Sequence, residues 1–309
     1  MCEYTTFSLN YNVEYFEKST IFVRIYYIYY THLLMTMFSD ILAYDFMQRA
    51  LLACLLSGIT CGIAGSYIVS RRMVFLSGGI THASFGGLGI ALYAGFSPTL
   101  GALVFAALSS VGIEFASRRG GMREDSAIGI MWSLGMAIGA LFMALRPGYA
   151  SDLTSYLFGN ILLVDRVDVV MLMLLTLFMV VGAIAMLRRI MYITFDEDYA
   201  LSQGMPVTVV AYVMAIVVAL VIVLSIKVMG IILLISLMTV PTVIANSLTK
   251  DYRYVTLLSA IIGVIGNVAG FVLSYNFNLP TGSCIIFILT LTLICVKVLT
   301  LCFNLRPRV

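Results

Sequence analysis

Nine apolar runs, each about 20 residues long and bounded by polar or charged residues, constrain this chain more than any other feature of its sequence. About 20 residues of α-helix cross the hydrocarbon core of a bilayer, which is about 30 Å thick. Because that core offers no water to backbone N–H and C=O groups, each run is expected to be helical. The sequence therefore predicts an all-α, polytopic membrane helix bundle, with spans at Phe46–Ser70, Val74–Ala94, Pro98–Ser117, Ser126–Leu145, Val167–Leu187, Val207–Ile226, Val228–Thr249, Tyr254–Ser274 and Thr281–Cys302.

The composition supports this class and excludes several others. Hydrophobic residues make up 61% of the chain and charged residues 11%, with a mean hydropathy of +1.05. An ordinary soluble domain is about 25% charged, so this chain has too few charges to cover a surface that faces water. The loops are too short to hold a nucleotide-binding fold, and the phosphate-binding pattern GxxxxGK[ST] is absent. Any ATP must therefore be bound by a partner chain, and no nucleic-acid partner is expected.

Lysine and arginine are divided unevenly between the two sets of loops that the runs define. Loops that follow odd-numbered runs, with the C-terminal tail, hold eleven, whereas loops that follow even-numbered runs hold three. Because cytoplasmic loops carry the excess of positive charge, the odd loops and the C-terminus are predicted to face the cytoplasm. The eleven are Arg71, Arg72, Arg118, Arg119, Arg123, Arg188, Arg189, Lys250, Arg253, Arg306 and Arg308, and the three are Arg146, Arg166 and Lys227.

Residues 1–45 do not follow this pattern and are predicted to be an N-terminal extension of the transmembrane domain 46–305. Their apolar stretch, Ile21–Phe38, is interrupted by polar residues and is not followed by a small-residue cleavage site of the secretory kind. We expect translation to begin at Met35 or Met37, so that residues 1–34 are dispensable. A tenth span over the apolar stretch is the alternative.

The second run is rich in glycine around a single histidine. Gly78, Gly79 and Gly86 lie near His82, and small residues let helices approach closely. An imidazole near the middle of a bilayer is costly unless it faces the bundle interior or a wet cavity. It is also a common ligand of Zn²⁺, Mn²⁺ and Fe²⁺. His82 is therefore a candidate metal ligand, and the alternative, which a single histidine favours, is a buried histidine whose ring bonds a neighbouring hydroxyl or carbonyl.

One acid, Glu114, lies well inside a predicted span, whereas Asp168 is at the first turn of another. Glu114 precedes Arg118 by four residues, and side chains at this spacing meet on a helix. The carboxylate could belong to an ion path, but the spacing favours an ion pair with Arg118 near the membrane interface.

The loop after the fifth run, Arg188–Pro206, contains three consecutive acids and ends in Gly204 and Pro206. It is long enough for a short helix beneath the membrane, and Gly204 is expected to end that helix with a positive φ. Composition leaves two interpretations open, a solvated loop and a docking element for a cytosolic partner.

Five segments, taken in order, resemble the membrane permease subunits of bacterial ABC importers for zinc, manganese and iron, of the ABC-3 type. The resemblance covers about residues 46–305. The segments are GITCGIAGSYIVSRRMVFLSGGITHASFGGLGIAL (58–92), DSAIGIMWSLGMAIGALFMAL (125–145), DLTSYLFGNIL (152–162), FDEDYALSQGMPV (195–207) and KVMGIILLISLMTVPTVIA (227–245).

The resemblance implies a set of partners and a location. Two copies of the chain would form the pathway in the bacterial inner membrane, and an extracytoplasmic metal-binding protein would deliver the ion. Cytosolic ATP-binding subunits would dock on the coupling segment 190–206, where this sequence matches the family at Phe195, Asp196, Ala200 and Gly204. The permease itself would bind no cofactor and perform no bond chemistry.

The resemblance also assigns roles within the pathway and exposes one departure. His82 would handle the metal, with Gly78, Gly79, Gly86 and Pro241 in the packing around the pathway. Many members carry an Asp one helical turn before this histidine, where the present chain has Gly78, so one ligand stands where two are usual. Zinc is favoured as cargo, with manganese or iron as alternatives. A permease for cobalamin or an iron-siderophore and an ion-coupled secondary transporter remain the other hypotheses.

Overall fold

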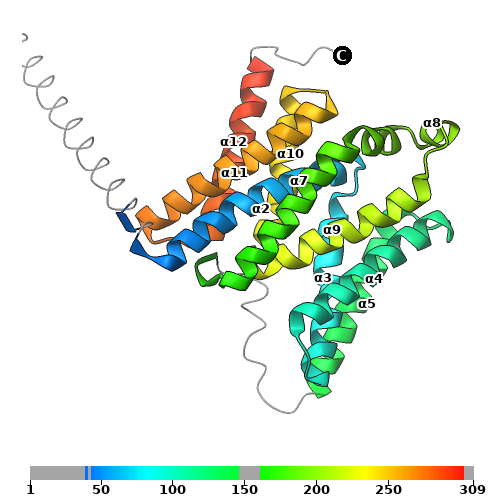
Figure 1. Cartoon of the computed structure of the whole chain (residues 1–309), viewed down its shortest axis with the longest axis horizontal. Coiled ribbons are helices and arrows are strands. Elements are labelled where there is room, and N and C mark those ends of the chain that lie inside the picture. The colour runs from blue at the N-terminus through cyan, green and yellow to red at the C-terminus, as the bar shows by residue number, and fades with distance from the viewer. Residues whose placement is uncertain (1–38, 41–42, 146–160, 303–309) are drawn as a thin grey trace, which may run out of the picture. The chain divides into compact units, whose positions relative to one another are not determined.

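The computed structural model describes residues 39–40, 43–145 and 161–302. The proposed start at Met35 or Met37 and most of the 152–162 segment lie outside these residues. The chain divides into two compact units, Met1–Gln48 and Arg49–Val309, and the packing described below lies within the second. The elements are α2 (Asp45–Ser70), α3 (Val74–Ala94), α4 (Pro98–Arg118), α5 (Glu124–Leu145), η1 (Ile161–Leu163), α7 (Arg166–Phe195), α8 (Glu197–Ser202), α9 (Val207–Met229), α10 (Ile231–Leu248), α11 (Tyr252–Phe277) and α12 (Thr281–Cys302) (Figure 1).

Nine of the helices in the described part of the chain are long and apolar enough to cross a membrane. They coincide with the nine predicted runs, so the all-α, nine-span prediction is confirmed for these residues. Every boundary except the end of the fifth span agrees with the prediction within three residues, and two of the differences have a clear physical cause.

The sixth and seventh spans are separated at Gly230 rather than at Lys227. Gly230 has φ 76° and ψ 169°, a conformation that costs glycine little and that ends α9 abruptly. Lys227 instead lies in the last turn of α9, where its Nζ is 2.8 Å from Oδ1 of Asp168 in the first turn of α7. The prediction was wrong here because a charge that is paired does not interrupt a helix.

The loop predicted to begin at Arg188 is mostly helical. α7 continues for 30 residues to Phe195, because it contains no proline and its single glycine, Gly182, lies within the helix without ending it. Asp196 then adopts an extended conformation and caps α8, accepting a hydrogen bond from the Tyr199 backbone N–H at 2.9 Å. The predicted short helix therefore exists as α8, and it follows α7 directly.

Polar side chains connect α2 to its neighbours α7 and α11. The hydroxyls of Thr60 and Thr176 are 2.8 Å apart, and Asn267 donates from Nδ2 to the carbonyl of Cys54 at 2.8 Å. Gly58 allows the backbone of α11 to approach, since a Cβ there would lie 2.7 Å from the Val264 nitrogen. Hydrogen bonds between helices and small residues at their contacts both favour association in lipid, where apolar burial alone gives no advantage.

α3 is packed against α5 and α4 with backbone in contact with backbone. A Cβ on Gly135 of α5 would lie 2.5 Å from the Cα of Ala83, and one on Gly86 of α3 would lie 2.8 Å from the Phe105 ring. Gly87 and Gly101 make the equivalent approach between α3 and α4. Gly86 and Gly87 of the second run therefore serve close helix packing, as the richness of that run in glycine predicts.

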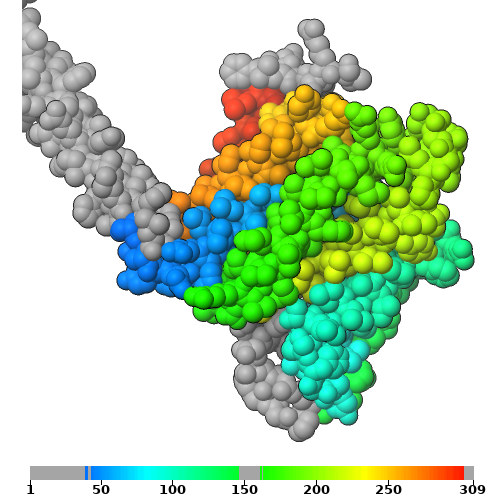
Figure 2. Space-filling model, viewed as in Figure 1, coloured from blue at the N-terminus to red at the C-terminus, as the bar shows by residue number. Residues whose placement is uncertain are grey.

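The outer surface of the described bundle is apolar. α7 runs along the face shown in Figure 2, in green, with its side chains outermost. Leu174, Leu177 and Ile184 are 62%, 61% and 80% exposed, respectively. Exposed aliphatic side chains on this scale would be unfavourable in water, and they match a surface that faces lipid.

The two glycines of α5 allow a matched test of this packing. Gly135→Ala should lower the free energy of unfolding by about 1–3 kcal/mol, because the new methyl group would overlap the α3 backbone. Gly129→Ala has open space around its Cβ and should be neutral or stabilise by up to about 1 kcal/mol through helix propensity. Thermal unfolding of both variants in detergent measures the difference, and equal stability would contradict the close α3–α5 contact.

Candidate functional site

His82 lies on α3 beside α5, and its imidazole stacks on the indole of Trp132. The ring centroids are 4.4 Å apart and the rings are inclined by 2°. Nδ1 of His82 is buried and has no hydrogen-bond partner among the described residues. The alternative in which the ring bonds a neighbouring hydroxyl or carbonyl is thus not realised at that nitrogen, which leaves a lone pair or a proton available for another ligand.

His82 does not belong to a preformed ligand cluster. Within residues 43–145 and 161–302, no group of three or more His, Cys, Asp or Glu side chains is arranged to hold a metal ion. A single imidazole suits a transient contact, because an ion in transit must also be released. An ion at His82 would draw its other ligands from water, from backbone carbonyls or from a second copy of the chain.

The glycines named with His82 differ in their surroundings. Gly79 faces the Ile128 side chain of α5, and Gly86 faces Phe105, in both cases closer than a Cβ could approach without movement. At Gly78, one turn before His82, a Cβ would lie 3.6 Å from Cδ1 of Ile235, which is an ordinary contact. Packing therefore requires glycine at positions 79 and 86, whereas position 78 has room for a side chain.

Pro241 is buried inside α10, where it lacks the N–H that would bond the Leu237 carbonyl. In the same turn, Gly65 of α2 approaches the Met238 carbonyl so closely that a Cβ could not be accommodated. Pro241 therefore lies beside a tight α2–α10 contact. Its role next to a pathway stays a prediction.

The coupling segment is anchored through one small residue. Ala200 of α8 is fully buried in an apolar cluster with Ile193 of α7 and Val207 of α9, against which Met205 and Val210 pack. This cluster holds α8 against the ends of the two long helices that flank it.

The other predicted coupling residues lie at the surface or shape the turn. Phe195 is 63% exposed and meets the Tyr252 ring edge-on, with centroids 5.7 Å apart. Gly204 has φ +72°, which confirms the predicted conformation, and open space surrounds it. The arrangement presents an aromatic side chain and the acids of α8 on an exposed surface, which suits docking of another protein.

A cluster of charges joins α8 to the base of the bundle. Oε1 of Glu197 lies 3.0 Å from Nη2 of Arg71, in the turn between α2 and α3, and 2.9 Å from Nη2 of Arg118, at the end of α4. Arg118 also pairs with Glu114, as its spacing of four residues predicts. One carboxylate thus ties the short helix to three long ones.

Burial of the Arg71 side chain strengthens its ion pairs in this cluster. Its side chain is only 11% exposed, and its Nη1 donates to the Tyr67 hydroxyl at 3.1 Å. Burial alone would lower the pKa of Arg71, but the Tyr67 hydroxyl and the carboxylates of Glu114 and Glu197 outweigh it and raise that pKa above its ordinary value. Arg71 is therefore a fixed positive charge at every physiological pH.

Sequence reasoning missed three of these contacts. Trp132 beside His82, Glu197 between two arginines, and the Asp168–Lys227 pair each join residues far apart in the chain. The two ion-pair contacts could have been anticipated, because the predicted topology places the acidic and basic residues of each on the same side of the membrane. No signal in a single sequence identifies which exposed face of α5 meets His82.

The chain is similar in sequence to membrane proteins of one transport family. The sequence profile described as the ABC 3 transport family matches residues 43–300. The manganese transport system membrane protein MntC of Halalkalibacterium halodurans is 32% identical over 251 residues, which are 81% of this chain and 86% of that protein. An uncharacterized membrane protein of Synechocystis is 36% identical over 247 residues, which are 80% of this chain and 88% of that protein.

A solved structure shares the arrangement of helices. One chain of PsaBC from Streptococcus pneumoniae, in complex with a Fab, matches with a TM-score of 0.75 and 26% sequence identity. The match covers 85% of this chain and 95% of that chain.

The Glu197 cluster predicts that loss of one charge loosens α8. Glu197→Gln should speed hydrogen exchange of the α8 amides about fivefold, since a half-exposed ionic hydrogen bond contributes about 1 kcal/mol. Asp198→Asn is the matched control, because Asp198 is the next residue, is exposed and makes no ion pair with a described residue. Exchange measured by mass spectrometry should leave the control unchanged, and equal exchange in both variants would contradict the anchoring role.

Proposed function

Because the chain belongs to the ABC 3 transport family, we propose that it is the membrane-spanning subunit of an ATP-driven importer of divalent transition metal ions. Two copies form the pathway, cytosolic subunits hydrolyse the ATP, and an extracytoplasmic protein delivers the ion. The observation that carries this proposal is the attachment of the exposed helix α8, through Glu197, to the turn that begins α3. It connects a docking surface to the helix that bears His82.

The attachment supplies a route from the ATP-binding subunits to the pathway. A cytosolic subunit that binds α8 moves Glu197, and Glu197 pulls on Arg71 and Arg118 at the bases of α3 and α4. Because α3 is packed on α5 by direct backbone contact, the two helices shift as one body. His82 and Trp132, one on each helix, move with that body. The side of the membrane from which His82 can be reached then changes.

Manganese is the first cargo to test. MntC of Halalkalibacterium halodurans and MntC of Listeria monocytogenes are named for manganese transport. Mn²⁺ is bound well by water, carbonyl and carboxylate oxygen, whereas Zn²⁺ favours several nitrogen or sulfur ligands. A pathway with one histidine and no described ligand cluster therefore fits Mn²⁺ better than the zinc preference drawn from the resemblance, and zinc and iron are the competing cargoes.

The orientation follows from charge. The end of the bundle that carries α8 also carries Arg71, Arg118 and Arg253, so the positive-inside rule places it in the cytoplasm. The C-terminus then lies on the same side, and the chain resides in the inner membrane of a bacterium. In this orientation α8 faces the compartment that holds ATP.

The two other transporter hypotheses have less support. An ion-coupled transporter is expected to use unpaired or mutually paired intramembrane acids, but Glu114 is neutralised by Arg118. The relatives named above refer to manganese, which favours a free ion over cobalamin or an iron-siderophore. The family consists of transport proteins, so a membrane enzyme is excluded as well.

Trp132 gives a direct assay of metal at His82. It is the one tryptophan of the chain and is stacked on the imidazole, so a paramagnetic Mn²⁺ ion bound there should quench its fluorescence saturably. His82→Asn keeps polarity and approximate volume but replaces imidazole with a poor ligand, and it should abolish saturable quenching. Titration of the purified chain with Mn²⁺ measures both.

A second variant tests the same site by gain of affinity. Gly78→Asp places a carboxylate one turn before His82, where a Cβ has ordinary clearance, and should lower the Mn²⁺ concentration at half-quenching. Gly79→Asp, one residue away, collides with Ile128 and serves as the control for added charge without the ligand geometry. If the fluorescence of His82→Asn is quenched at the same Mn²⁺ concentration as that of the wild-type chain, His82 is not a metal ligand and serves packing alone.

A further inference from the structure

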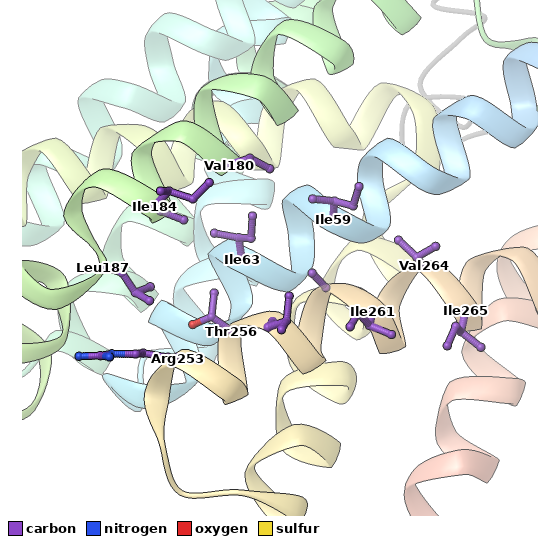
Figure 3. Close-up of a pocket in the computed structure, with 13 residues that line it drawn as sticks. Ile59, Ile63, Val180, Ile184, Leu187, Arg253, Thr256, Ile261, Val264 and Ile265 are labelled. Carbon is purple, nitrogen blue, oxygen red and sulfur yellow. The ribbon is translucent and has the colours of Figure 1, made fainter.

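An apolar groove of about 520 Å³ lies on the outer surface between α2, α7 and α11 (Figure 3). α2 forms its floor, and α7 and α11 form its walls. The lining is aliphatic along most of its length, and among the described residues that form it Arg253 supplies the one charged group. The residues that define it best are Ile59 and Ile63 on the floor, Val180 and Ile184 on one wall, and Ile261 and Ile265 on the other.

The groove has a direction, because its charge lies at one end. Arg253 is in the first turn of α11, whereas Ile265 lies three turns further along the same helix. Thr256 also lines the groove, but its hydroxyl is bonded to Ser66 and to the Tyr252 carbonyl. The result is an aliphatic channel that ends at a guanidinium, at the end of the bundle where α8 lies.

The guanidinium of Arg253 is available to a ligand. Its side chain is exposed, and the salt bridges among the described residues do not include it. It also borders a second, more polar hollow of about 550 Å³. Besides Arg253, the charged residues that line that hollow are Lys250, Asp251 and Asp196. The two carboxylates repel an anion, so an anion is favoured at the Arg253 guanidinium on the groove side.

We propose that this groove binds an anionic phospholipid, with one acyl chain along the aliphatic walls and the phosphate on Arg253. Basic residues between transmembrane helices at the cytoplasmic surface attract anionic headgroups, and aliphatic walls accept a chain without polar cost. A second copy of the protein fits this surface less well, because a helix packed into the groove would bury the Arg253 charge without a partner. The lipid site does not depend on the transported cargo.

The bound lipid would lie beside the coupling segment. Arg253 shares the polar hollow with Phe195 and Asp196, the residues that connect α7 to α8. The headgroup would therefore occupy the surface next to the one on which the ATP-binding subunit docks.

Two matched pairs of variants test the site by native mass spectrometry of the full chain in detergent, titrated with phosphatidylglycerol or phosphatidylcholine. Arg253→Gln should weaken phosphatidylglycerol binding about fivefold and remove the preference over phosphatidylcholine. Arg119→Gln removes an exposed arginine at the same end of the bundle, away from the groove, and should change neither. Ala183→Trp should fill the groove and abolish the tight site, whereas Ala185→Trp, on the exposed face of α7, should not.

Several results would overturn the proposal. One is equal binding of the two lipids by the wild-type chain, and another is unchanged binding in Arg253→Gln. A third is that Ala183→Trp leaves lipid binding intact but separates a dimer into single chains, because the groove would then be an interface between copies. If Ala183→Trp does not fold, the arginine pair decides the outcome alone.

Discussion

The backbone contact of α3 with α5 and α4 is the interaction on which the rest of this structure depends. In lipid, where apolar burial does not drive helices together, close approach through Gly86, Gly87 and Gly135 supplies the packing energy. The same approach places His82 on one helix against Trp132 on the other. A side chain at any of these glycines would separate the helices and move the imidazole away from its aromatic neighbour.

The ionic cluster around Glu197 converts that packing into a mechanism. A carboxylate on α8 contacts arginines at the bases of α3 and α4, so displacement of a surface helix acts directly on the packed pair. Ala200 holds α8 in place on an apolar cluster, while Phe195 remains exposed for a partner. The segment is thus firmly attached to the bundle yet open to docking, which is the combination that transmission of movement requires.

The membrane architecture could be predicted from the sequence, and the site only in part. Run length and charge set the nine spans, because the bilayer imposes one helix length on every segment. Gly204 and the Glu114–Arg118 pair were predictable because each is local in the chain. The break at Gly230 was placed at Lys227, since the neutralising Asp168 lies 59 residues away. Trp132 beside His82 was missed for the same reason, and the start of the chain remains a prediction.

The central claim is that ATP bound by a partner at α8 drives a metal ion past His82. The most direct measurement is uptake of radioactive Mn²⁺ into proteoliposomes that contain the complete importer, with its ATP-binding subunits inside the vesicle and the delivery protein outside. The account predicts accumulation that requires ATP in the lumen and persists when every ion gradient is collapsed. Accumulation that continues without ATP and stops when a proton or sodium gradient is dissipated would contradict it.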